Sequence, residues 1–409
     1  MIIRVYDRYF RRVDILKKYT YCQVTDKVRD IGTFTVNVAL DSDSEYLLDE
    51  TQTYYLHFKD EYEKHPVMGE ILKAKKDSEE EQEIIKLEGK LCINVFAQRV
   101  IEKTQNYYGT IPDIMQSIVE TNISGNPSTS GSINPRYIDI TIHRDIVQRD
   151  VSGSVSVQKT GDLVSDVLFE LAEQKELCLD FYPTISGLHQ DEHLGSLYPE
   201  TNISKWNLDI ITGDDRTRRN SYGNVPLVFS QSYSNIERVT YEVDKGDYKN
   251  VAYVAGEGEG EQRRVEKICA EGYEENSVEN IGFQRREMYV DARDLQKETE
   301  DGETITEEEY KNLLAQRGTE NLLEHIVCMS YDGTMIVYNT KGELRYTYGK
   351  DFYKGDKVEI IDNSLGVKIV AQITAVTRTY QKGQGTIFDI EFGNKKYTLR
   401  KRKERKGRL

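Results

Sequence analysis

The chain has 409 residues, a formal net charge of −15, 31% charged residues and 38% hydrophobic residues. This length is sufficient for two to four domains, each with its own core. No run of 18 apolar residues occurs, and the first residues alternate as in a strand, so the sequence predicts neither a membrane span nor a signal peptide.

The numbers of cysteine and aromatic residues further limit the classes of protein to which the chain can belong. The five cysteines are odd in number, lie far apart and form no CxxC pair, so we expect neither a zinc site nor a disulfide framework, and synthesis in a reducing cytoplasm. The 28 tyrosines, against the single Trp206, favour a β-rich protein with subunit contacts.

Most of the chain shows the period-two alternation of strands, and three segments show the patterns of helices. Predicted strands occupy 32–40, 51–59, 67–77, 82–91, 235–243, 250–255, 334–340, 357–364, 367–381 and 386–393. Predicted helices occupy 110–121, with Thr110 as its cap and Pro112 in its first turn, 162–177, and a segment from the capping box Thr306–Glu309 to about His325. A polar loop is expected at 124–135.

A glycine-rich stretch, NVAYVAGEGEGEQRRV at 250–265, superficially resembles a phosphate-binding loop. Its three glycines alternate with three glutamates, which would place carboxylates where a phosphate sits, and no Gly-Lys-Ser/Thr follows. We therefore expect a hairpin between two strands.

Two hairpins far apart in the chain look alike, at 67–90 and 369–394. From Ile71 to Gly89 is 18 positions and from Ile373 to Gly393 is 20, so only the hairpin tip differs. A strand-like segment precedes each, 31–41 for the first and 248–258 for the second. The pattern predicts one small β-barrel used twice, the second interrupted by an insertion that carries the third helix. The alternative is two unrelated hairpins that look similar.

Five features follow one another in a specific order: Gly32, Phe34, Val36 and Val38, then LEGKLCINVFAQRVI (87–101), the glycine-rich stretch, VDARD (290–294) and the segment 353–380. This order resembles that of phage tail hub proteins. The family of siphophage and prophage tail proteins with a baseplate hub fold implies a mainly β chain with α+β insertions, containing two tube-type β-barrel domains plus smaller α+β lobes. The expected divisions are a first barrel at 1–100, an α+β lobe at 101–205, a second barrel at 206–265 and 331–398, a helical insertion at 266–330 and a basic tail at 399–409.

The resemblance also implies a function. Three chains would form a ring of six barrels, a homotrimeric hub at the distal end of the tail tube that joins the tube to the tip or baseplate and gates the DNA channel. Its partners would be itself, distal tail and tail tube proteins, and a tape-measure or spike protein, with DNA passing without specific binding along a channel lined by part of the acidic excess. Such a chain is a structural part of the virion tail and not an enzyme. The alternatives are an envelope-directed hydrolase or a carbohydrate-binding adhesin.

The candidates for chemistry are weak, and we predict no catalytic, cofactor-binding or metal-binding residue. His189 and His193 are four positions apart, but Gln190 stands where a metalloprotease has its glutamate, and a solvated loop is expected. His57 is expected on one face of a strand, while His65, His143 and His325 have no obvious partner in the sequence. The segment 212–220 offers Asp214, Asp215, Arg216, Arg218 and Arg219 and is expected to be a charged surface loop, and Arg293 in VDARD to form a local ion pair.

The end of the chain is basic. From Lys395 onward there are nine Lys or Arg and one Glu, a local charge of +8 that leaves −23 on the rest. This tail could bind a phosphate backbone, pair with an acidic partner or be a solvated terminus.

Overall fold

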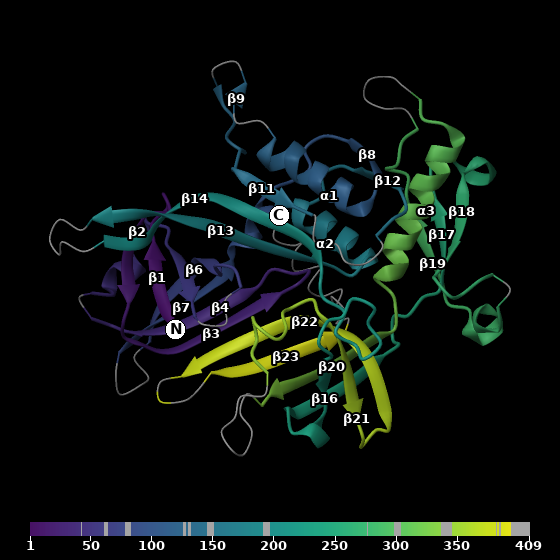
Figure 1. Ribbon diagram of the computed structural model, residues 1–409. Coiled ribbons are helices and arrows are strands. Elements are labelled where there is room, and N and C mark those ends of the chain that lie inside the picture. The colour runs from purple at the N-terminus through teal and green to yellow at the C-terminus, as the bar shows by residue number, and fades with distance from the viewer. Residues whose placement is uncertain are drawn as a thin grey trace.

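The main feature of the molecule is one 13-stranded sheet built from the two ends of the chain (Figure 1). The computed structural model describes residues 1–41, 43–60, 64–77, 83–125, 128–129, 132–144, 151–190, 197–275, 277–297, 304–336, 346–381, 383 and 386–393. Within these ranges strands dominate, as expected for a mainly β protein with α+β additions.

The first half of the sheet comes from the N-terminal part of the chain. Its strands are β1 (Ile2–Tyr6), β2 (Arg12–Leu16), β3 (Tyr19–Lys27), β4 (Thr33–Ala39), β5 (Tyr55–Lys59), β6 (Met68–Asp77) and β7 (Ile84–Leu91). They are ordered β3-β4-β7-β6-β5-β1-β2, and adjacent strands are antiparallel. Alternate residues such as Cys22, Val24 and Val36 are buried, which is the pattern of a sheet with one face on a core.

The second half comes from the C-terminal part, with two strands, which are not neighbours in the sheet, contributed from the middle of the chain. Its strands are β15 (Val228–Phe229), β16 (Ile236–Asp244), β20 (Cys328–Met335), β21 (Lys357–Asp362), β22 (Val367–Gln381) and β23 (Ile387–Gly393). They are ordered β16-β20-β23-β22-β21-β15 and enclose a separate aromatic core that includes Phe229, Phe388 and Phe392.

The two halves share one strand topology. In chain order, β3, β4, β5, β6 and β7 correspond to β16, β20, β21, β22 and β23, and each set has the same neighbours in the sheet. Both hairpins also carry a bulge at the same place, after Ile71 in β6 and after Ile373 in β22. A bulge at an equivalent position argues against unrelated hairpins, so the predicted repeat is confirmed as a repeat of strand order and pairing.

Two details of the predicted repeat are wrong. Ile71 lies opposite Gly89 but Ile373 lies opposite Phe392, so the closing glycines are offset by one position. The partner of the second hairpin is β20 and not 248–258. The ladders of the described residues close neither half into a barrel, and the tube-type barrels stay a prediction.

The segment 248–258 belongs instead to an inserted lobe. There β17 (Val251–Ala255) pairs antiparallel with β18 (Val265–Cys269) and parallel with β19 (Glu287–Asp291), beneath helix α3 (Glu307–Leu323). The glycine-rich stretch is therefore a hairpin, as predicted. β17 is buried along most of its length because α3 covers it, and such an apolar strand fits a small lobe as well as a barrel.

A second lobe joins the two halves along the chain. It contains β8 (Gln105–Gly109), α1 (Ile111–Val119), β9 (Ser128–Thr129), β10 (Ser132–Ile133), β11 (Ile140–His143), β12 (Val155–Lys159), α2 (Val164–Gln174), β13 (Leu177–Gln190) and β14 (Leu197–Thr212). The predicted caps are confirmed. Thr110 Oγ1 accepts a hydrogen bond from the backbone amide of Asp113, and Thr306 and Glu309 form a capping box at the start of α3. None of the helices in the described ranges has the length and apolarity needed to cross a membrane.

Replacing Ile373 with Asp tests the core of the second half. Ile373 is fully buried on β22, so the variant places an uncompensated carboxylate among aromatic rings. We expect a loss of about 3 kcal/mol or more in the free energy of unfolding, measured by urea denaturation. The control is Gln381→Asp, at an exposed position of the same strand, which we expect to change stability little; equal effects of the two variants would contradict the assignment of Ile373 to the core.

Candidate functional site

The two halves meet edge to edge through strands β22 and β3. β22 has 15 residues; its first part pairs with β21, and its second part pairs antiparallel with β3 from Ala375–Lys27 to Gln381–Tyr21. On the solvent side the junction is tied by hydrogen bonds between side chains. The hydroxyls of Thr25 and Thr377 are 2.9 Å apart, and Gln23 Nε2 donates to Thr379 Oγ1 over 3.2 Å.

On the core side of the junction lies a buried ion pair. Arg378 on β22 is 2% exposed, and its Nη1 lies 2.7 Å from Asp60 Oδ2 at the end of β5. The Tyr380 hydroxyl donates to the same carboxylate. Burial alone lowers the pKa of Arg378, but the charge of Asp60 outweighs it and raises that pKa. The second half is thus held to the first by backbone pairing on one strand and by charge beneath it.

A second buried cation joins three segments. Lys354, which precedes β21 and is 3% exposed, donates to Asp26 Oδ1 on β3 over 2.6 Å. Its Nζ also lies 3.2 Å from Asp180 Oδ1 on β13, and the Tyr353 hydroxyl donates to Asp180 Oδ2 over 3.1 Å. This one ammonium group therefore links both halves of the sheet to the α+β lobe.

The two carboxylates do not share this cation equally. Burial alone lowers the pKa of Lys354, but the charges of Asp180 and Asp26 raise it above its ordinary value. Burial raises the pKa of Asp26, and Lys354 offsets this only in part. At Asp180 burial acts in the same direction, but Lys354 and His65 outweigh it and lower the pKa. Lys354 therefore remains charged, and Asp180 is its better-stabilised partner.

His65 lies at the border of this cluster. Its ring stacks on Tyr182 with centroids 4.0 Å apart, and its Nε2 is 3.7 Å from Asp209 Oδ2 on β14. Burial lowers the pKa of His65, although Asp180 and Asp209 act in the opposite direction. The sequence offered His65 no partner because its neighbours come from strands more than 100 positions away.

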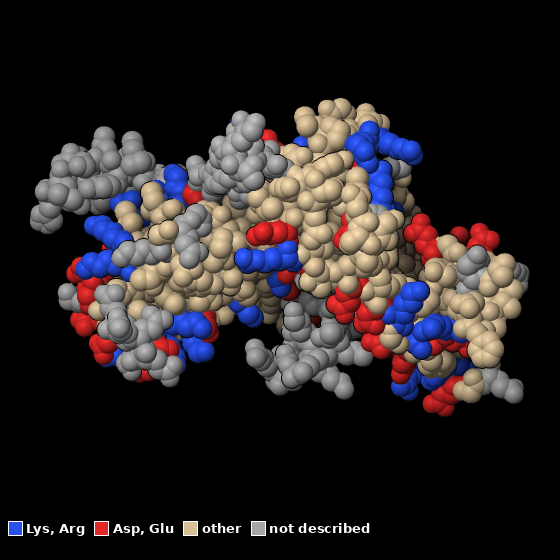
Figure 2. Space-filling model, turned by 90° about the horizontal axis from the view of Figure 1, so that it is seen from below, with Lys and Arg blue, Asp and Glu red and all other residues tan. Residues whose placement is uncertain are grey.

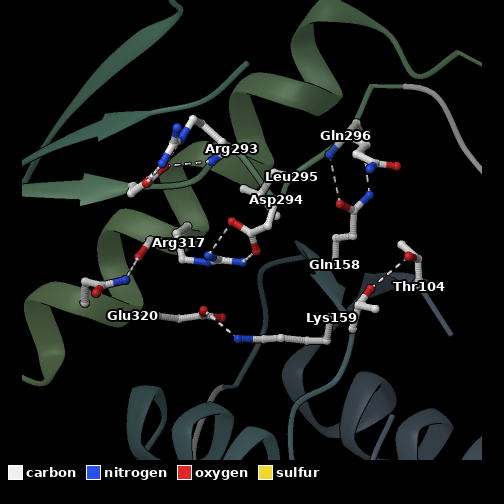
Figure 3. A network of polar contacts seen from close by, with 12 residues as sticks. Thr104, Gln158, Lys159, Arg293, Asp294, Leu295, Gln296, Arg317 and Glu320 are labelled. Carbon is white, nitrogen blue, oxygen red and sulfur yellow. Dashed lines mark hydrogen bonds and ion pairs between the residues drawn. The ribbon is translucent and has the colours of Figure 1, made fainter. Parts of the chain in front are cut away.

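A separate polar network fixes the inserted lobe against the α+β lobe (Figure 3). Lys159 on β12 points to α3, with Nζ 2.8 Å from Glu320 and 3.2 Å from Glu170 on α2. Burial alone lowers the pKa of Lys159, but these two carboxylates raise it. Beside it, Gln158 Oε1 accepts the backbone amide of Gln296 over 3.0 Å. The contacts of Lys159 with Glu320 and of Gln158 with Gln296 cross from one lobe to the other.

Segment 212–220 is not the simple surface loop that we expected. Arg216 Nε lies 2.7 Å from Asp356 Oδ2, and Arg218 Nε lies 2.8 Å from Glu359 Oε2. The side chains of Asp356 and Glu359 are 5% and 2% exposed, so the arginines balance one carboxylate buried just before β21 and one buried on it. The segment therefore secures the start of the second half. The only sequence signal for this role is the cluster of three arginines, Arg216, Arg218 and Arg219, and the sequence does not show that the partners of the first two lie 140 and 141 positions further along the chain.

The other candidate residues are dispersed. His57 is buried on β5, as expected, with its Nδ1 3.4 Å from Arg4 Nη1. His143 contacts Asn207, and His325 contacts the backbone of Asn321. His193 and the side chain of His189 lie outside what the structure describes. Among the residues that it does describe, no group of three or more His, Cys, Asp or Glu could hold a metal ion.

Surface charge does not mark a single site either. The predicted ion pair in VDARD is confirmed, with Arg293 Nη2 2.6 Å from Asp291 Oδ2. On the face shown in Figure 2, acidic and basic side chains gather mainly toward the two ends, and the broad area between them carries few charged side chains. The features that bring distant segments of the described chain together are therefore strand edges and buried ion pairs.

Replacing Lys354 with Met tests the central cation. The variant keeps the volume but leaves Asp26 and Asp180 buried without it, and we expect a loss of about 3–5 kcal/mol in the free energy of unfolding. Lys18→Met is the control, because Lys18 pairs with Asp41 in an exposed position and should matter little. A Lys354→Met protein as stable as the parent in chemical denaturation would contradict a structural role for this cation.

The lowered pKa of His65 predicts a dependence on pH. Protonation of this side chain favours the unfolded chain, so its contribution to stability is complete above the ordinary pKa of 6.5 and is lost progressively as the pH falls from that value through the lower pKa of the folded state. We expect His65→Phe, which retains a ring against Tyr182, to lose less stability between pH 7 and pH 5 than the parent. Parallel pH profiles from thermal unfolding would contradict this.

Known proteins similar to this chain include phage and prophage tail proteins. The family model for the Siphovirus ReqiPepy6 Gp37-like protein matches residues 2–394. No curated protein matches the chain. Among solved structures, a tail protein from Neisseria meningitidis MC58 is similar with a TM-score of 0.50 and 13% identity, covering 96% of each chain. The 43 kDa tail protein of prophage MuSo2 from Shewanella oneidensis is similar with a TM-score of 0.51 and 13% identity, covering 96% of this chain and 98% of its own.

A further similarity extends over the whole chain. The prophage tail protein gp18 from Listeria monocytogenes EGD-e covers 100% of this chain and 99% of its own at 12% identity and a TM-score of 0.49. At such low identities the solved structures show only that the fold is similar. The family model, by contrast, matches nearly all of the sequence and shows the family. The resemblance to siphophage proteins drawn from the sequence is confirmed: the chain belongs to the Siphovirus ReqiPepy6 Gp37-like protein family and has the fold of phage tail proteins.

Proposed function

We propose that this protein is a structural component of the virion tail, a homotrimeric hub at the distal end of the tail tube that joins the tube to the tip or baseplate and gates the DNA channel. The observation that carries the proposal is the repeat: one chain contains the same five-strand topology twice, joined edge to edge through β22 and β3. Three such chains supply six similar units, so a trimer with threefold symmetry can fit the end of a tube with sixfold symmetry.

In this proposal each half of the sheet is a tube-type barrel unit completed by its neighbours. β2 and β16 stand at the two ends of the strand order, so each has a backbone edge with no ladder partner among the described strands. Val13 on β2 and Val243 on β16 are also exposed, at 50% and 43%. Unpaired strand edges with apolar side chains favour pairing with another chain, which supports assembly as the function of the sheet.

The solvent side of the shared sheet is the surface that we assign to the channel. At the junction it carries neutral hydroxyls and amides, including Thr25, Thr377 and Gln23. Away from the junction the first half contributes five lysines and an acid among them, Lys27, Lys73, Lys75, Lys86, Lys90 and Glu88, and the second half Glu242, Asp244, Asp332, Asp389 and Glu391. A channel of this composition would hold no continuous basic track, so DNA could pass without specific binding. Most of the acidic part of the lining comes from the second half, and Glu88 of the first half lies among lysines.

The two lobes have a different role in the proposal. We place the insertion at 245–327, between β16 and β20, where the first half has only the short β3–β4 turn. The insertion contacts the α+β lobe through Lys159 and Gln158 and lies with it away from β16, β20 and β23 in Figure 1. These lobes are the surfaces that we assign to distal tail, tape-measure or spike proteins.

The mass of the protein in solution tests the proposal. Light scattering after size exclusion should give three times the chain mass of 47.3 kDa at high concentration, with dissociation on dilution. A mass of one chain at every concentration, or a stable two-chain species, would contradict the trimeric hub.

A further inference from the structure

We propose that β16 of one chain pairs antiparallel with residues 73–77 of β6 in a second copy, with Lys73 opposite Asp244 and Lys75 opposite Glu242. The inference rests on the proposed ring and adds to it the partner strands and their register. It follows from the junction inside the chain, because the repeat contains a second set of the same two edges.

β6 and β22 are equivalent strands of the repeat. The β5–β6 ladder ends with Tyr55 opposite Glu70, and the β21–β22 ladder ends with Lys357 opposite Gln372. The bulges follow one residue later, after Ile71 and after Ile373. Both features give the same offset of 302 positions, so Lys73 of β6 corresponds to Ala375 of β22, and Lys75 to Thr377.

β3 and β16 are also equivalent strands of the repeat. Because Gly89 and Phe392 occupy equivalent places opposite the two isoleucines, Lys90 corresponds to Gly393. Reading across the sheet, Lys90 is opposite Thr33, which is opposite Thr25 of β3. In the other half, Gly393 is opposite Ser330, which is opposite Glu242 of β16. Thr25 therefore corresponds to Glu242, and Lys27 to Asp244.

The junction observed within the chain transfers to the second pair of edges. Within the chain, Thr377 lies opposite Thr25 and Ala375 opposite Lys27. Between copies these pairs become Lys75 opposite Glu242 and Lys73 opposite Asp244. The intervening pair, Val376 opposite Asp26, becomes Ala74 opposite Val243. Two ion pairs and one apolar pair result, although charge played no part in deriving the register.

The register is the best that these strands offer electrostatically. A shift of two residues in one direction places Lys73 opposite Glu242 but Lys75 opposite Thr240. A shift in the other direction places Lys75 opposite Asp244 but Lys73 opposite Gly246. Only the inferred register gives both lysines an acid, and directly opposed charges of opposite sign stabilise antiparallel pairs.

Both edges are available in a single chain. β16 ends the strand order, and β5 leaves β6 at Glu70, so residues 73–76 pair only with β7 among the described strands. The side chains of Lys73 and Lys75 are 63% and 61% exposed, and their contacts to Glu88 and Asp77 lie at the surface. Pairing with another copy would cover these strands without disrupting the fold.

Such pairing is head to tail, because a β16 edge accepts a β6 edge and each chain keeps one of each. Heterologous contacts of this kind close into a ring when the rotation permits. Halves would then alternate around the ring, a first half always beside a second half. The junction within a chain and the junction between chains would be two versions of one contact.

Cysteine cross-linking tests the register. Under mild oxidation, the double variant Lys75→Cys with Glu242→Cys should form covalent multimers that a non-reducing gel resolves. The control, Lys75→Cys with Thr240→Cys, moves one partner two residues along the same face and should give about tenfold less product. The parent protein, with its native cysteines, sets the background. Equal multimer yields from the two double variants would overturn the register.

Charge reversal gives a second, reversible readout. Lys75→Glu and Glu242→Lys should each weaken association by roughly threefold to tenfold, and the combined variant should restore it. Lys86→Glu, on the same face but one strand inward on β7, should leave association unchanged. Failure of the combined variant to restore association would contradict the pairing.

The proposed function and the proposed register fail in different ways. A mass of three chains without register-dependent cross-linking or restoration would overturn this pairing and leave the hub intact. A mass of one chain at every concentration would overturn the hub and the pairing together.

Discussion

The structure depends on the ladder between β22 and β3, which joins two copies of one strand arrangement through seven residue pairs. It forms because β22 extends beyond its partner β21 and offers its remaining backbone groups to the free edge of β3. A strand edge is satisfied only by another strand, by a covering element or by water. Within one chain the edges of β22 and β3 satisfy each other. In the pairing that we propose, the equivalent edges of β6 and β16 are satisfied by a neighbouring copy.

Ion pairs buried beneath this ladder favour one register between the two halves of the sheet. Arg378 with Asp60, and Lys354 with Asp26 and Asp180, are ion pairs that cost desolvation and gain only when their geometry is right. A slipped register would leave each of them unpaired in a low-dielectric interior, which is far more costly than losing a surface pair. Such contacts contribute little net stability but strongly disfavour the wrong alignment of the two halves.

Local signals in the sequence were sufficient for much of the fold. Thr110, Pro112 and the Thr306 capping box located helix starts because caps act within one turn, and alternation located β4, β6, β7 and β22 because one face of each meets the core. The assignment of 248–258 failed because β17 is apolar along most of its length, which fits a central strand of either sheet. The partners of His65, Arg216 and Lys354 could not be predicted, since each is fixed by strands far away in the chain.

The central claim is that two similar sheet units per chain alternate around a ring. A high-resolution reconstruction of the assembled protein tests it most directly. The account predicts six units around one axis, each second half beside the first half of the next chain, with β16 and β6 in backbone contact. Like halves meeting each other, or chains joined through their helical lobes with β16 facing solvent, would contradict it.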